Sequence, residues 1–177
     1  MKYVVMEDEG EEFLFSFPKN NLMVHADMAE SINHLTGCKK ENTREFYAAQ
    51  TVSAGFVNAG GNCHGHSESL SLQSRPQDTA LYQGERHYFV IALANHEYLI
   101  TFPAHMDIDH KAVYDAVTTI KVHTSRNNWE RKFRGAQVVS AGLIDTGMNC
   151  HGESESLGVT SRPEKDTALL KMQLCNP

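Results

Sequence analysis

The chain has 177 residues and a formal net charge of −6, with 41% hydrophobic and 21% charged residues. This composition is ordinary for a water-soluble globular protein, and an acidic chain without a basic stripe is poorly suited to bind nucleic acid. No apolar run reaches the roughly 20 residues of a membrane helix. The acidic stretch after Tyr3–Met6 does not fit a signal peptide, so we expect a cytoplasmic protein without membrane contact.

The chain opens with two short β-rich runs, Tyr3–Met6 and Phe13–Phe17, on either side of an acidic turn. A similar pair, Tyr88–Ile91 and Tyr98–Phe102, surrounds the polar turn Ala94–His96. Two β-rich runs around a short polar turn predict a β-hairpin. We therefore expect one hairpin near the start of the chain and one near its middle.

A helix is predicted after each hairpin, because apolar residues recur at i, i+4 and i+7 and so share one helical face. These residues are Met28, Ile32 and Leu35 in the first helix, and Val113, Val117 and Ile120 in the second. Asp109 is expected to cap the start of the second helix, and Gly37 to end the first. The polar segments 39–44 and 123–131, which follow the helices, are predicted to be loops.

The remaining segments are strand-like and contain an internal repeat. Residues 52–76 read VSAGFVNAGGNCHGHSESLSLQSRP, and residues 139–163 read VSAGLIDTGMNCHGESESLGVTSRP, identical at 16 of 25 positions. A repeat at a constant offset indicates two copies of one structural unit. We expect an α+β protein of two ββαββ units, 1–84 and 85–177, with mainly antiparallel sheets and approximate two-fold symmetry. Units of this size bury limited apolar surface, so we expect them to pack together as one body.

His25 and His110 occupy equivalent places at the two predicted helix starts. The positive end of a helix dipole disfavours the protonated form of a histidine in the first turn. Near pH 7 such a side chain would be mainly neutral imidazole, which can accept a proton. The alternative is a surface or capping histidine without a chemical role.

The repeated Ser-Glu-Ser turns are candidate anion sites, because hydroxyl and backbone N–H groups at a turn can bind an anion. Their serines are Ser67, Ser69, Ser154 and Ser156. Arg75 and Arg162, in the Ser-Arg-Pro turns, are candidates to supply a guanidinium for phosphate. The alternative is that Glu68 pairs with Arg75 inside the first unit.

No cofactor is expected, and a metal site at the Cys-His strands is the last of the alternatives. Alternation along a strand places Cys63 and His64 on opposite faces, which prevents them from binding one ion together. Cys150 and His151 repeat this pair, and the four cysteines of the chain fit reduced thiols better than disulfides. A phosphate-binding P-loop, a dinucleotide fingerprint and a Ser-His-Asp pattern are all missing from the sequence.

Four short motifs resemble the janus/ocnus family of phosphohistidine phosphatases. They are Lys2-Tyr-Val-Val, His25-Ala-Asp-Met, His64-Gly-His-Ser67 and Pro76-Gln-Asp-Thr-Ala-Leu81. The resemblance covers most of the first unit and extends to the second through His110 and Glu153-Ser154. The chain departs from the family pattern at His87, which stands in place of Lys2, and in the acidic Ser-Glu-Ser turns.

This resemblance implies a phosphohydrolase in which His25, and in the second unit His110, is the general base that activates water or accepts the phosphoryl group. It also implies that Lys2 and the turn around Ser67 and Ser69 hold phosphate. The expected partner is then a small phosphorylated molecule or a phosphoprotein. The alternative function is a non-catalytic module that binds a small ligand or a protein on the same scaffold.

Overall fold

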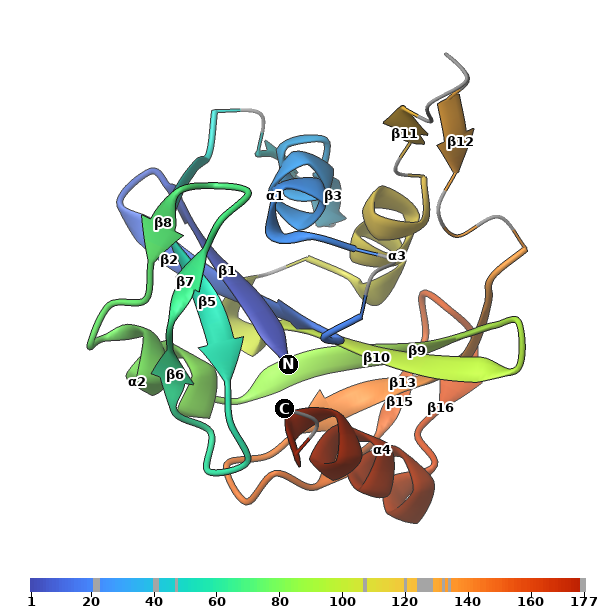
Figure 1. Cartoon of the computed structure of the whole chain (residues 1–177). Helices are drawn as coiled ribbons and strands as arrows, with labels where there is room; N and C mark the ends of the chain where they lie inside the picture. Colours follow the sequence, from blue (N-terminus) through green and yellow to red (C-terminus); the bar gives the residue numbers. More distant parts are fainter. Residues whose placement is uncertain are drawn as a thin grey trace.

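The computed structural model describes residues 1–20, 23–39, 42–46, 48–106, 108–119, 121–123, 129–131, 133 and 135–175. Its centre is an eight-stranded antiparallel sheet with the order β14-β13-β9-β10-β2-β1-β5-β6 (Figure 1). The strands are β1 (Lys2–Asp8), β2 (Glu11–Phe17), β5 (Gln50–Val57), β6 (Cys63–His64), β9 (Arg86–Leu93), β10 (His96–Pro103), β13 (Gln137–Ile144) and β14 (Cys150–His151).

Helices cover both faces of this sheet, as Figure 1 shows. They are α1 (His25–Asn33), α2 (Asp78–Gln83), α3 (His110–Thr118) and α4 (Pro163–Cys175), with a short 3-10 turn at Ala104–Met106. Alternate residues of β1 divide between the faces: Val4 packs with α1 and α3, whereas Tyr3 packs with α2 and α4. A sheet with two apolar faces explains why the central strands are hydrophobic throughout. The protein is an α+β protein with a mainly antiparallel sheet.

The strands of residues 1–84, the first half of the chain, form one side of the sheet, and those of residues 85–177, the second half, form the other. The two sides meet where Ser16 on β2 is opposite Thr101 on β10. The two buried hydroxyl groups are hydrogen-bonded across the junction at 2.7 Å. Both halves therefore contribute to one continuous sheet.

Most predicted elements are confirmed. The two hairpins are β1–β2 and β9–β10, and α1 and α3 lie where the apolar spacing predicted helices. The Asp109 carboxylate caps α3 by accepting a hydrogen bond of 2.7 Å from the Ala112 N–H. The expected role of Gly37 is wrong, because α1 ends at Asn33. Ile120 lies outside the described residues.

The prediction of loops after α1 and α3 is wrong, because two small hairpins lie in these segments. Strands β3 (Thr36–Lys39) and β4 (Asn42–Glu45) pair with each other, as do β11 (Lys121–His123) and β12 (Trp129–Arg131). These segments are polar and lack the alternation that predicts a half-buried strand, so their pairing was not visible in the sequence. Two further short ladders join β7 (His66–Ser67) to β8 (Leu72–Gln73), and β15 (Glu153–Ser154) to β16 (Val159–Thr160). Within the described ranges, the helices are too short or too polar to cross a membrane.

Candidate functional site

His25 is the first residue of α1, and its ring is buried against the sheet. The side chain is 5% exposed, and the rings of Phe17 and Phe56 contact it edge-on at centroid distances of 5.8 and 5.5 Å. Its Nε2 lies 2.8 Å from the carbonyl oxygen of Gly55 on β5. Because a carbonyl oxygen only accepts, Nε2 carries the hydrogen. The lone pair of the neutral ring is therefore on Nδ1.

The surroundings of His25 favour this neutral form. Burial lowers the pKa of His25 below its ordinary value, and the charge of Lys2 lowers it further. The hydrogen bond to Gly55 acts in the opposite direction and does not cancel the effect of burial. At neutral pH the imidazole is thus a base with a fixed orientation.

Gly55 is needed for the close contact between β5 and β6 that accompanies this hydrogen bond. A Cβ atom built on Gly55 would lie 2.5 Å from the backbone oxygen of His64 and 3.2 Å from the Tyr3 ring. No larger residue fits there without moving a strand. The glycine in the repeated sequence thus permits the backbone position whose carbonyl orients His25.

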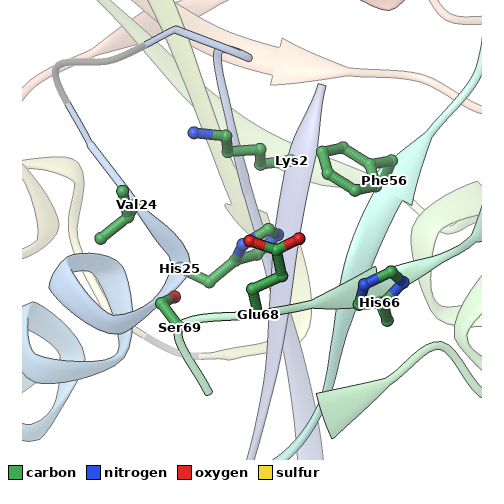
Figure 2. Close-up of a pocket in the computed structure, with 7 residues that line it drawn as sticks. All are labelled: Lys2, Val24, His25, Phe56, His66, Glu68 and Ser69. Atoms are coloured by element: carbon green, nitrogen blue, oxygen red, sulfur yellow. The ribbon is translucent and has the colours of Figure 1, made fainter. Parts of the chain in front are cut away.

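His25 opens onto a pocket of about 350 Å³ (Figure 2). The residues that line it come from β1, the start of α1 and the residue before it, β5, β7 and the β7–β8 turn. They are Lys2, Val24, His25, Phe56, His66, Glu68 and Ser69. The Lys2 ammonium donates hydrogen bonds of 2.8 and 2.9 Å to the backbone oxygens of Asn20 and Met23. These bonds hold a positive charge at the pocket wall.

The Ser-Glu-Ser turn reaches the start of α1. The Ala26 N–H donates to Ser69 Oγ at 3.3 Å, and Ser69 Oγ lies 3.4 Å from Ser67 Oγ. The Ser67 hydroxyl also accepts a hydrogen bond from the Leu70 N–H and is buried behind the turn. The pocket therefore brings together three residues singled out in the sequence, Lys2, His25 and Ser69, with Ser67 supporting the turn.

Arg75 and Arg162 lie elsewhere. The Arg75 guanidinium donates to Glu12 at 2.7 and 3.0 Å and to Asp78 at 3.1 and 3.0 Å, so its partners are these carboxylates and not Glu68. Arg162 binds Glu97 and Asp166 in the same manner. These hydrogen bonds raise the pKa of both arginines. Arg75 thus links the turn after β8 to the β1–β2 hairpin. Arg162 links the turn after β16 to the β9–β10 hairpin in the same way.

The second half contains a related but different arrangement around His110. Its Nε2 lies 2.9 Å from the Gly142 carbonyl oxygen, and the Lys111 N–H donates to Ser156 Oγ at 3.2 Å. Ser156 Oγ in turn lies 3.4 Å from Ser154 Oγ. Burial lowers the pKa of His110, against a smaller opposing effect of the hydrogen bond to Gly142.

The main difference in this second arrangement is His87, which stands where the first half has Lys2. Its ring contacts the His110 ring edge-on at a centroid distance of 4.7 Å. Burial, followed by the charge of His110, lowers the pKa of His87 to about 4. The second arrangement therefore lacks the lysine charge that borders the pocket of the first.

Cys63 and Cys150 are poorly suited to comparable chemistry. Burial, with a further contribution from Asp78, raises the pKa of Cys63 to about 12. Burial likewise raises the pKa of Cys150 to about 11. Both are protonated thiols at neutral pH, whereas metal binding and nucleophilic attack need the thiolate. In the described part of the chain, no three His, Cys, Asp or Glu side chains converge as metal ligands would.

Four pocket residues were not assigned to the site from the sequence: Val24, Phe56, His66 and Glu68. Val24 directly precedes His25. Phe56 follows Gly55 directly, and His66 and Glu68 flank Ser67, so their nearness to known candidates was the available signal.

The chain matches no protein-family model, no curated protein and no solved structure.

Proposed function

We propose that the pocket at His25 binds a phosphate group and hydrolyses its ester or phosphoramidate bond, with His25 as general base. The observation that carries this proposal is the oriented, neutral His25 ring in a pocket with the Lys2 ammonium and the Ser69 hydroxyl. A phosphohydrolase needs a base for the attacking water and positive charge or donors for the phosphoryl oxygens. The proposed enzyme would be similar to the janus/ocnus phosphatases.

We also propose that the chain consists of two janus/ocnus-like units, 1–84 and 85–177, related by an approximate two-fold axis between β2 and β10. The strand order supports this, because the strands of the two halves follow the same order from each edge of the sheet to its centre. The corresponding pairs are β6 and β14, β5 and β13, β1 and β9, and β2 and β10. Ser16 and Thr101, which meet at the junction, lie at matching places in the two hairpins.

In the proposed reaction, the oxygen of a water molecule attacks phosphorus while His25 Nδ1 takes a proton from that water. The bond from phosphorus to the leaving oxygen or nitrogen breaks with both electrons remaining on the leaving atom, and this atom then takes a proton from the imidazolium. The Lys2 ammonium offsets charge on the phosphoryl oxygens. Ser69 can donate its hydroxyl hydrogen to the phosphate while it accepts from the Ala26 N–H.

The experiment is phosphate release from phosphohistidine and from an aryl phosphate by wild type, His25→Ala and the matched variant His110→Ala. We expect His25→Ala to lower turnover by at least about a hundredfold, the usual contribution of a positioned base, and His110→Ala to retain most of it. Equal turnover in wild type and His25→Ala would contradict the proposal.

A second candidate is a non-catalytic module that binds a phosphorylated ligand at the same place. Glu68 favours it, because a carboxylate at the pocket raises the energy of an attacking, partly deprotonated water. The two candidates differ in one result. Binding of phosphate that depends on His25 and Lys2, without turnover, would select the binding module.

A further inference from the structure

Glu68 is the one acidic side chain among the residues that line the pocket, and a plain phosphate ligand does not explain it. Figure 2 shows its carboxylate extending from the β7–β8 turn towards the side of the pocket where Lys2 and Phe56 lie. Arg75, which follows β8, is bound to Glu12 and Asp78 and does not neutralise it. A phosphate beside this carboxylate would meet repulsion unless the ligand brings a positive charge of its own.

Phe56 provides the second part of a cation site. Its ring lines the same pocket, and the Lys19 ammonium, which lines a second pocket that shares Phe56, lies 5.1 Å from the ring centroid. Aromatic faces attract ammonium groups through the negative charge of the π system, and more strongly when water is excluded. A carboxylate and an aromatic ring in one pocket are the chemistry that recognises a quaternary or primary ammonium.

The pocket lining therefore contains groups of two kinds. Lys2, His25 and Ser69 suit an anion, whereas Glu68 and Phe56 suit a cation. Resting on the proposed function, we propose that the ligand is a small phosphate monoester whose short carbon chain carries a positively charged nitrogen. Its phosphate lies on the His25 side and its ammonium between Glu68 and Phe56. A pocket of about 350 Å³ has room for both groups on one short chain.

The second half offers a natural comparison. Glu155 corresponds to Glu68 in the sequence, but Leu143 stands in place of Phe56, and His87 in place of Lys2. The second half therefore keeps the acid without the ring or the lysine. We assign this ligand class to the first half alone, and Glu155→Gln is the matched control for Glu68→Gln.

The test compares phosphocholine with 3,3-dimethylbutyl phosphate, which has the same shape but a carbon atom in place of the charged nitrogen. Binding to the full chain is measured by calorimetry for wild type, Glu68→Gln, Phe56→Leu and Glu155→Gln. We expect wild type to prefer phosphocholine by about tenfold, the combined effect of one exposed charge pair and one cation–π contact. In Glu68→Gln the preference is expected to fall to about twofold or less, whereas Glu155→Gln keeps it.

Phe56→Leu should reduce the preference without abolishing binding of either compound. Glycerophosphocholine, a diester like a lipid headgroup, should bind more weakly than phosphocholine, and tighter binding would overturn the assignment to a monoester. Equal binding of the two matched phosphates by wild type, or a preference that survives Glu68→Gln, would overturn the inference about the cation.

Failure of the proposed function has a different result. If inorganic phosphate leaves the NMR signals of the His25 ring unchanged, and neither monoester binds, then the phosphate site itself is wrong and both proposals fall. If phosphate shifts those signals in wild type but the charged and neutral esters bind alike, the proposed phosphate site stands. Only the inference that Glu68 and Phe56 bind a cation is then wrong.

Discussion

Nε2 of His25 and the carbonyl oxygen of Gly55 are 2.8 Å apart, and this one contact fixes both the tautomer and the orientation of the buried ring. The two residues come from different elements, the first turn of α1 and strand β5. A base positioned in this way loses little freedom when it acts, which is how a positioned group accelerates proton transfer. The chemistry of the pocket therefore depends on the backbone at a glycine.

Gly55→Ala should destabilise the protein, because the added methyl group would lie 2.5 Å from the His64 carbonyl oxygen and force β5 and β6 apart. We expect a loss of about 1–3 kcal/mol, typical of an overpacked core. Urea unfolding measures it. Gly84→Ala is the control, since a Cβ there meets its nearest atom at 3.7 Å and should change stability by less than about 0.5 kcal/mol. Equal stability of both variants would show that the β5–β6 contact is looser than described.

Stability should decrease as the pH falls from about 6.5 towards 4. The unfolded chain protonates His87 near its ordinary pKa of about 6.5, whereas the folded protein does so only at about 4. In this window the unfolded state binds more protons, so acid favours unfolding. His25 and His110, whose pKa values are also lowered, contribute with the same sign.

The pH effect is checked by urea unfolding at several pH values. His87→Phe, placed beside the Phe102 ring that His87 already contacts at 5.0 Å, should make the dependence on pH shallower. The exposed His96 provides the control, and His96→Gln should leave the slope near that of wild type. A His87→Phe protein with an unchanged slope would contradict the assignment.

Arg75→Met should destabilise the protein by about 3 kcal/mol, because it leaves the fully buried Asp78 carboxylate without its cation. The Tyr3 hydroxyl, which donates to Asp78 at 2.7 Å, compensates only in part. Thermal and urea unfolding measure the loss. Lys111→Met removes an exposed ion pair with Asp115 and should leave stability close to that of wild type. Similar losses in the two variants would mean that Arg75 is not a structural tie.

His87→Lys should create a second phosphate site, because it gives the second half the cation that Lys2 supplies in the first. We expect calorimetry with inorganic phosphate to change from one bound phosphate to two. In the His25→Ala background, the same substitution should restore a single site that depends on His110. A His87→Lys protein that still binds one phosphate would show that the second half lacks more than a positive charge.

Much of the fold could be predicted from local patterns. The β1–β2 and β9–β10 hairpins follow from β-rich runs around polar turns, and α1 and α3 follow from apolar residues at helical spacing. The β3–β4 and β11–β12 hairpins were missed, because pairing between polar segments leaves no periodic signal. The continuous sheet depends on a contact between β2 and β10, residues 85 positions apart at Ser16 and Thr101.

The site was predictable only in part, for a related reason. The sequence singled out His25, Lys2 and Ser69 by the repeat and by a family resemblance, and these side chains line one pocket. Arg75 was a candidate to bind phosphate or to pair with Glu68, yet its guanidinium binds Glu12, which is 63 residues away. Pairings over such distances are set by how the hairpins pack, which local patterns do not encode.

The contact between Ser16 and Thr101 also bears on how such a chain can arise. Two residues at matching places in their hairpins meet there, so a single unit with one free β2 edge could have met a second copy of itself in the same way. Joining two such copies into one chain would preserve the sheet while releasing each copy from the need to remain identical. Under the proposed two-unit organisation, His87 in place of Lys2 is such a difference: the pocket at His25 keeps its lysine, whereas the arrangement around His110 has a histidine.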